Sequence, residues 1–254
     1  MINRIGLWAA AVSTGAFAFS AAALAADMPV KAPPPVVVAV YNWTGLYIGI
    51  QGGYAWGDTR HEQLVFAADT GDFRIKGGLV GGTVGYNYQV NSIVLGIEAD
   101  YSWSGIKGDA GPFVVGTFGC GLAPRGCVTE VERFGTVRGR LGVAANQFLI
   151  FASGGWAYGR VHAFLDGVSG QPPFGYNGSG SRSGWAAGGG VEYGFTPNLS
   201  AKLEYLRVDL GKLTYGQPGM VACNLGSCAT ATAEFNVIRA GLNWRFGGPV
   251  VARY

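Results

Sequence analysis

Two pairs of acidic residues have a spacing that acid–base catalysis could use. Glu98 and Asp100 are two positions apart, and Glu192 and Glu204 lie in neighbouring segments. Two carboxyl groups in one site can divide the roles of proton donor and acceptor. The charged residues expected on the same side of these segments, however, number four of each sign: Glu98, Asp100, Glu192, Glu204, Arg138, Arg140, Lys202 and Arg239. Because a buried charge requires a partner, the equal numbers favour a structural ion-pair network over a catalytic pair.

Other catalytic signatures are missing from the sequence. It contains no G-x-S-x-G elbow, no G-x-G-x-x-G after a strand, no phosphate loop ending in Gly-Lys and no H-E-x-x-H. The two histidines, His61 and His162, fall in long loops, where we expect solvated side chains rather than general bases. We therefore expect no enzyme, no cofactor and no metal site. A lipid-modifying enzyme that uses one of these histidines is the alternative.

The composition indicates what surrounds the folded chain. Of 254 residues only 13% are charged, whereas 13% are aromatic and 44 are glycine. Soluble proteins have roughly 25% charged residues, so we expect most of the surface of this protein to contact something other than water. The high apolar content excludes disorder, and a net charge of +3 is too small to indicate a nucleic-acid partner.

Alternation with a period of two dominates from Trp43 onward, and this pattern predicts strands. Each run is longer than an ordinary soluble strand and close to what a tilted strand needs to cross a membrane. We therefore predict an all-β, eight-stranded, antiparallel up-and-down transmembrane barrel over residues 43–246. Its strands are expected near residues 43–56, 77–90, 93–104, 130–144, 148–159, 184–195, 199–209 and 234–246.

The connections between these runs are of two kinds. Only two or three residues follow the second, fourth and sixth runs, whereas roughly 20 to 25 residues follow the first, third, fifth and seventh. Short turns at one rim and long loops at the other are typical of outer-membrane barrels. We expect the long loops outside the cell and both termini in the periplasm of a Gram-negative bacterium.

Residue parity assigns the two faces of the barrel wall. Ile97 and Leu242 belong to the apolar set expected to face lipid, whereas Glu98 and Arg239 belong to the set expected to face the lumen. A soluble barrel such as a lipocalin would reverse the faces. Aromatic residues on the lipid side are expected to form two girdles: Tyr54, Trp56, Tyr101, Trp103, Trp156, Tyr158, Trp185 and Tyr205 at one rim, and Trp43, Tyr86, Tyr88, Phe148, Tyr193, Phe195, Trp244 and Phe246 at the other.

The segments outside the barrel have compositions of their own. Residues 1–25 have one positive charge, an apolar run and an A-x-A ending, which predict a cleaved signal peptide. An uncleaved helical anchor over residues 5–26 is the alternative. Residues 26–42 are proline-rich and predict an extended periplasmic leader. We expect no helical span after the signal peptide. Residues 247–254 form a C-terminal extension.

The four cysteines fall as two local pairs in long loops. The separations fit no common zinc pattern, and a secreted context favours disulfides. We predict the pairs Cys120 with Cys127 and Cys223 with Cys228.

The chain contains the motifs ADMPVKAPP from Ala26, WTGLYIG from Trp43, GTVRGRLG from Gly135, GGGVEY from Gly188, LEY from Leu203 and RAGLNWRF from Arg239. These motifs resemble the alphaproteobacterial outer-membrane immunogenic protein family, whose members have small OmpA-like barrels. The resemblance implies a surface-exposed eight-stranded protein, described as porin-like or as a surface antigen. It also implies that Leu242, Trp244 and Phe246 form the signal read by the barrel assembly machinery. Members commonly end at that aromatic residue, and this chain continues beyond it.

These features together predict a non-enzymatic barrel with a structural and surface role. The expected partners are outer-membrane lipid and lipopolysaccharide, the barrel assembly machinery, and a host or extracellular ligand at the loops. A small-solute pore or uptake protein is the alternative function.

Overall fold

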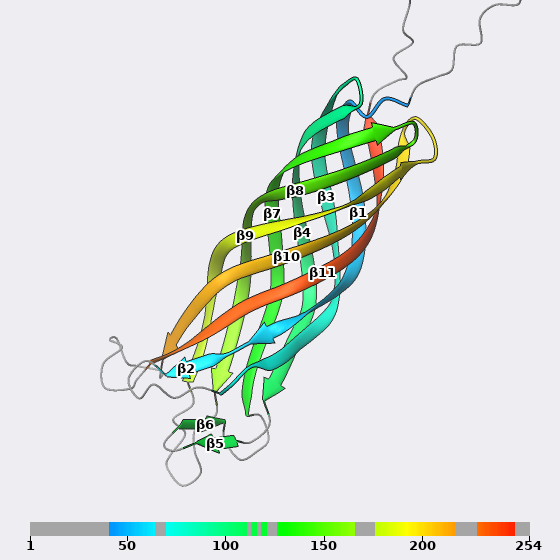
Figure 1. Ribbon diagram of the computed structural model, residues 1–254. Helices are drawn as coiled ribbons and strands as arrows, with labels where there is room; N and C mark the ends of the chain where they lie inside the picture. Colours follow the sequence, from blue (N-terminus) through cyan, green and yellow to red (C-terminus); the bar gives the residue numbers. More distant parts are fainter. Residues whose placement is uncertain are drawn as a thin grey trace, which may run out of the picture. The chain divides into compact units, whose positions relative to one another are not determined.

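A computed structural model describes residues 41–63, 70–110, 113–115, 118–120, 126–165, 176–216 and 228–246. The expected signal peptide, nearly all of the expected leader and the C-terminal extension lie outside these ranges. Long antiparallel strands wind around a common interior (Figure 1). The long strands are β1 (Gly45–Thr59), β3 (Phe73–Val90), β4 (Ile93–Ala110), β7 (Cys127–Ala145), β8 (Phe148–Leu165), β9 (Tyr176–Gly194), β10 (Leu199–Gly216) and β11 (Cys228–Phe246).

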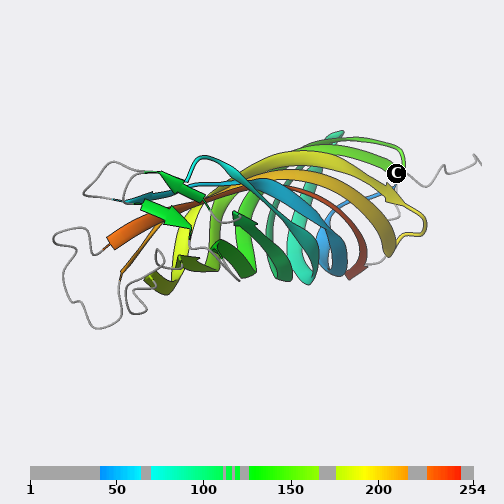
Figure 2. The same cartoon turned by 90° about the horizontal axis from the view of Figure 1, so that it is seen from below.

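The sheet closes on itself because its first and last strands pair. β1 pairs with β11 from Leu46 opposite Phe246 to Asp58 opposite Glu234. The short strand β2 (His61–Gln63) continues the same register along β11, so it is an extension of β1 after a break at Arg60. The described residues therefore form an eight-stranded barrel, as predicted, and Figure 2 shows its strands curving around the interior. The hairpin of β5 (Phe113–Val115) and β6 (Phe118–Cys120) forms a separate sheet.

Short turns at one end of the barrel agree with the predicted connections. Asn91 and Asn146 begin two of these turns with positive φ values of 52° and 53°. Asparagine accepts this left-handed conformation better than most residues, so it favours a tight hairpin. In the third turn, the Thr196 hydroxyl accepts a hydrogen bond of 3.0 Å from the Leu199 backbone N–H. Strand boundaries at this end match the prediction within about two residues.

At the long-loop end the strands extend farther than predicted. β9, for example, begins at Tyr176 rather than near residue 184. Two strands carry bulges in this region: β7 between Val131 and Arg133, where its pairings with both β4 and β8 shift, and β10 between Asp209 and Lys212. Beyond the bulges the strands continue, but the two faces exchange character. Inward side chains there are apolar, and many outward ones are charged. The apolar-out, polar-in alternation therefore ends before the strands themselves end.

The interior consists of three layers along the barrel. A small apolar cluster near the short turns contains Trp43, Val94, Leu149 and Phe151. The eight charged residues lie beyond it, and a larger apolar core that includes Phe134 fills the long-loop half. No helix in the described ranges is long and apolar enough to cross a membrane.

Candidate functional site

The central layer of the lumen is a cluster of interlocking ion pairs. Arg138 on β7 lies 2.8 Å from Glu98, 3.0 Å from Asp100 and 2.5 Å from Glu204, each distance joining a guanidinium nitrogen to a carboxylate oxygen. Arg239 on β11 lies 3.0 Å from Asp100 and 2.8 Å from Glu204. All five side chains are buried. Each buried charge thus has a partner of opposite sign, which compensates for the loss of hydration.

These ion pairs cross the barrel as well as linking neighbouring strands. The Lys202 ammonium on β10 donates to both carboxylate oxygens of Glu98 on β4 at 2.8 Å. In the strand order β4 and β10 face each other across the barrel. Tyr47 on β1 donates its hydroxyl to the same carboxylate at 2.7 Å. Glu98 therefore connects opposite walls through the middle of the lumen.

A second ion pair lies next to this cluster. Arg140 lies 2.5 Å from Glu192, and its guanidinium carbon is 3.7 Å from the centre of the Phe151 ring. The other oxygen of Glu192 accepts hydrogen bonds from Ser200 at 2.6 Å and Asn243 at 2.9 Å. This carboxylate is thus held in place by three strands.

All eight charged residues expected in the lumen lie there, and each carboxylate contacts a cation. Glu192 and Glu204 share no contact, so they do not form an acid–base pair. The polar partners Tyr47, Thr136, Ser200 and Asn243 were not singled out from the sequence, although their parity places them on the lumen side. No group of three or more His, Cys, Asp and Glu side chains in the described ranges could hold a metal ion.

Trp43 closes the short-turn end of the lumen and does not belong to the lipid-facing girdle, which corrects the prediction. Its side chain is fully buried, and its backbone N–H donates to Gln89 at 2.7 Å. The guanidinium of Arg245 lies 4.7 Å from the centre of the Trp43 ring and donates to the Asn42 carbonyl at 2.8 Å. The residue precedes β1, so strand parity does not determine where its side chain points. The inward turn of residues 41–44 fills this mouth.

His61 is buried in the long-loop half of the lumen, which corrects the expectation of a solvated loop residue. Its ring nitrogens lie 2.7 Å from the Thr129 hydroxyl and 2.8 Å from the Tyr215 hydroxyl. Burial without a charged partner lowers the pKa of His61 to about 4, so the imidazole is neutral near pH 7. His162 lies on the outer surface of β8, with its Nε2 atom 3.1 Å from a Glu132 oxygen.

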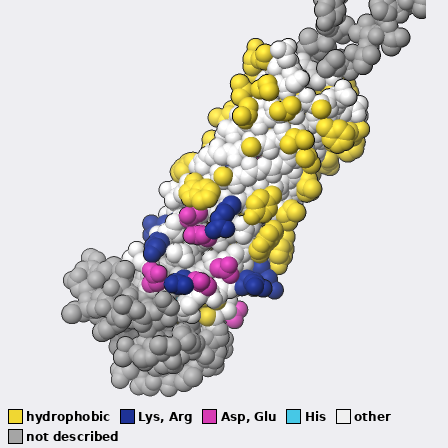
Figure 3. All heavy atoms as spheres, viewed as in Figure 1, with side chains coloured by type: hydrophobic (Ala, Val, Ile, Leu, Met, Phe, Trp, Pro, Cys, Tyr) yellow, Lys and Arg dark blue, Asp and Glu magenta, His cyan; other side chains and the backbone are white. Residues whose placement is uncertain are grey.

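The outer surface of the barrel has the apolar character predicted from parity. Ile97 is 57% exposed and Leu242 is 47% exposed, whereas Glu98 and Arg239 are 2% and 1% exposed. Apart from Trp43, the expected girdle residues lie on the outward face or in the adjoining turn. Figure 3 shows hydrophobic side chains over much of the visible wall and charged side chains gathered toward the long loops. A soluble barrel would have the opposite faces, so this surface is suited to lipid.

Leu242, Trp244 and Phe246 follow one another on the outward face at the end of β11. Leu242 and Phe246 are opposite Ile50 and Leu46 of β1 where the barrel closes. The strand expected to carry the assembly signal is therefore also the closing strand.

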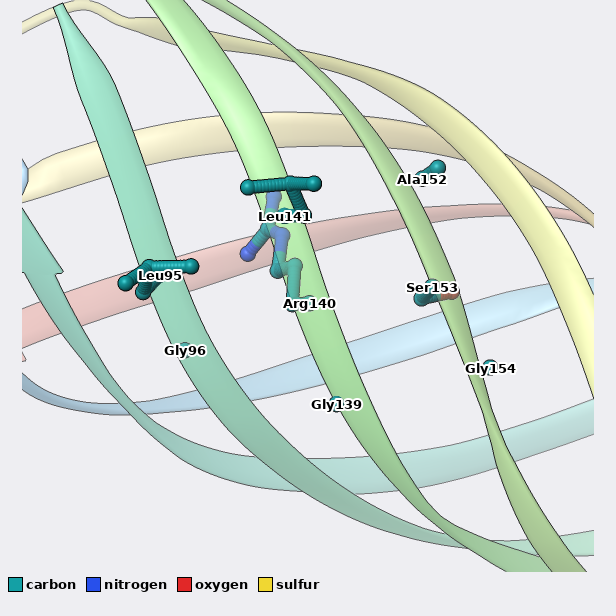
Figure 4. A pocket seen from close by; sticks show the side chains of 8 residues that line it. All are labelled: Leu95, Gly96, Gly139, Arg140, Leu141, Ala152, Ser153 and Gly154. Atoms are coloured by element: carbon teal, nitrogen blue, oxygen red, sulfur yellow. The ribbon is translucent and has the colours of Figure 1, made fainter.

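The outer wall has shallow hollows where small residues replace bulky ones. One lies between Leu95 and Leu141 and is floored by Gly139, Ala152 and Gly154 (Figure 4). Arg140 also borders the hollow, but its side chain points into the lumen, where it pairs with Glu192. The hollow itself therefore lies on the lipid-facing surface.

Cys127 takes part in a disulfide bond, and so does Cys228. The side chains of Cys120 and Cys223 lie outside the described residues, so the predicted pairing stays a prediction.

A closed antiparallel barrel with an apolar outer wall, aromatic residues toward both rims and paired charges inside defines the class of integral β-barrel membrane proteins. Comparison with known proteins gives the family. Residues 9–246 match the outer membrane protein beta-barrel domain, and the chain belongs to this family.

Relatives in two bacterial genera are similar over most or much of the chain. The 31 kDa outer-membrane immunogenic protein of Brucella melitensis is 36% identical over 241 residues, covering 90% of this chain and 95% of the relative. The 22 kDa outer membrane protein of Rhizobium leguminosarum is 31% identical, covering 68% of this chain and 67% of the relative. The chain is thus an outer-membrane protein, and the resemblance found in its motifs is confirmed.

The crystal structure of the outer membrane protein OprG from Pseudomonas aeruginosa has the same fold. The two chains superpose with a TM-score of 0.52 at 14% identity, covering 82% of this chain and 100% of OprG. At this identity the likeness concerns the fold alone.

Proposed function

We propose that the protein is a non-enzymatic barrel with a sealed lumen, which strengthens the outer membrane and presents its long loops at the cell surface as antigens. The filled interior is the observation that carries this proposal. The small apolar cluster, the layer of ion pairs and the larger apolar core follow one another along the lumen, and each contains side chains from several strands. A solute would have to displace all three.

The surface role is supported by the Brucella relatives, whose names describe immunogenic proteins. Leu242, Trp244 and Phe246 would serve as the signal for the barrel assembly machinery, and the loops would be available to a host or extracellular ligand. The carboxylates are neutralised by cations and His61 is engaged on both ring nitrogens, which supports a non-enzymatic role.

Conductance in planar bilayers tests the sealed lumen against a small-solute pore. We expect no resolved current steps from the purified full chain. The variant Trp43→Ala should also remain silent, because the ion-pair layer is intact. The charge-neutral double variant Glu98→Ala with Lys202→Ala removes a contact across the lumen and serves as the comparison most able to leak. Heat-modifiable migration on gels verifies that each variant is folded. Reproducible, ion-selective steps from the unmodified monomer would overturn the proposal.

A further inference from the structure

Cationic side chains gather on the outward face where β3, β4 and β7 leave the aromatic girdle. Lys76 is the cross-strand partner of Trp56, and Arg133 is the partner of Trp103. Lys107 is directly opposite Lys76. All of these side chains are exposed. The three cations therefore lie at or just beyond the height of aromatic residues, which in outer-membrane barrels mark the membrane interface.

These three cations differ from others on the outward face because they have no carboxylate partner. Lys76, Lys107 and Arg133 form no hydrogen bond or ion pair with another residue in the described part of the chain. Arg74, farther out on β3, also has no carboxylate partner among the described contacts. The paired cations are Arg60 with Asp72 at 2.9 Å, Arg160 with Glu132 at 3.7 Å, Arg207 with Glu234 at 2.7 Å and Lys212 with Glu62 at 3.2 Å.

The register places like charges next to one another. Lys76 is opposite Lys107, and Arg133 is opposite Arg160. Like charges directly opposite in a sheet destabilise it. Glu130 is opposite Lys107, but the two form no ion pair among the described contacts. A bound anion would offset this repulsion.

Two glycines leave an open floor between these cations and the girdle. Gly78 and Gly105 are outward-facing neighbours, since a Cβ atom at Gly105 would lie 4.0 Å from the Gly78 carbonyl oxygen. A Cβ atom at Gly78 would meet nothing closer than 3.9 Å. Side chains would therefore fit at both positions. Without them the backbone is accessible between Trp103 on one side and Lys107 on the other.

We propose that Lys76, Lys107 and Arg133 bind the phosphate group of a glycolipid in the outer leaflet. The headgroup would rest over Gly78 and Gly105, and its apolar part would continue down the wall beside Trp103. Val80, the cross-strand partner of Trp103, is 62% exposed and begins that apolar surface. A lipid fits better than a soluble anion because the cations border apolar wall directly. The proposal rests on insertion in the outer membrane and not on the sealed lumen, so the two can fail separately.

Binding of lipid A to the folded full chain in detergent tests this site. The test variant combines Lys76→Gln, Lys107→Gln and Arg133→Gln, and the matched control combines Arg60→Gln, Arg207→Gln and Lys212→Gln. The two variants remove the same charge from different parts of the outer surface. Native mass spectrometry with diphosphorylated lipid A measures the affinity. Each interfacial cation contributes about fivefold, so loss of all three should weaken binding by the test variant about 100-fold relative to the unmodified chain. The control should stay within about threefold.

The remaining arms identify the ligand and exclude general charge effects. Lipid A with its phosphates removed should bind as weakly to the unmodified chain as diphosphorylated lipid A binds to the test variant. Inorganic phosphate at millimolar concentration should not displace the lipid. Equal weakening by the test and control variants would overturn the site. Undiminished binding of dephosphorylated lipid A, or displacement by free phosphate, would overturn the assignment of a phosphorylated lipid. Heat-modifiable migration again verifies folding.

Discussion

Arg138 and Arg239 lie beside the same carboxylates, and this arrangement explains how two guanidinium groups can share a buried layer. Both contact Asp100 and Glu204 within 3.0 Å. Removing one partner of a buried ion pair costs about 3–5 kcal/mol because the other charge is left uncompensated. Each charge in this layer is therefore stable in the lumen only while its partners are present.

His61 makes the stability of the barrel depend on pH. Its pKa is lowered from 6.5 to about 4, so the unfolded chain takes up a proton more readily than the folded barrel. The resulting stability is fully present above pH 6.5 and is lost as the pH falls toward 4. The loss amounts to about 3 kcal/mol. Denaturation at pH 7 and pH 4.5, compared between the unmodified chain and His61→Gln, should show a steeper loss in the former. A ring titration midpoint near 6.5 by NMR would contradict the burial of this side chain.

Residue parity was sufficient to place the eight charged lumen residues, because a strand assigns every second side chain to the same face. It was not sufficient for Trp43, which precedes β1 and turns into the mouth. It also fails for His61, because residue 61 lies beyond the strand predicted over residues 43–56. The partners of His61 on β7 and β10 are far from it in sequence, and no local pattern indicates them.

Strand length is the element-scale property that the sequence predicted least well. Apolar-out, polar-in alternation identifies the strands only where lipid surrounds them. Beyond the girdle the same strands have apolar residues inside, such as Val161 and Leu213, and charged residues outside, such as Glu130. The pattern there resembles that of a soluble barrel. The bulges on β7 and β10 add a shift of parity, so the two parts of each of these strands do not share a single alternation.

Adjacent glycines on β1 provide a test of how the barrel closes. A Cβ atom at Gly53 would lie 2.2 Å from the Ile238 carbonyl oxygen on β11, whereas one at Gly52 would meet nothing closer than 3.6 Å. Gly53→Ala should therefore disturb the β1–β11 pairing and destabilise the barrel by about 1–3 kcal/mol, as overpacking does. Gly52→Ala should be tolerated. Urea denaturation of the two folded variants measures the difference. Equal stability of the two variants would show that the β1–β11 pairing can accommodate a methyl group at position 53, and the prediction would then be wrong.

At the scale of the whole molecule, the reversal of polarity defines where the barrel leaves the membrane. Apolar side chains cover the outer wall up to the girdle, and charged side chains follow (Figure 3). The extension beyond the girdle has its own apolar core, which includes Phe134 and Phe235 with ring centres 5.2 Å apart. Two solvents thus act on one continuous sheet. The part in lipid holds charges inside, and the part in water holds apolar groups inside.

Cysteine labelling of a single strand locates this boundary. Ser181 and Val191 both point outward from β9 and are exposed, but Trp185 of the girdle lies between them. A water-soluble maleimide applied to intact cells should therefore modify Ser181→Cys and leave Val191→Cys unmodified. The unmodified chain gives the background from its own cysteines. Both variants should react after denaturation, which verifies that each thiol is free. Equal labelling of the two positions on intact cells would place the apolar wall in water, and the membrane assignment of this face would then be wrong.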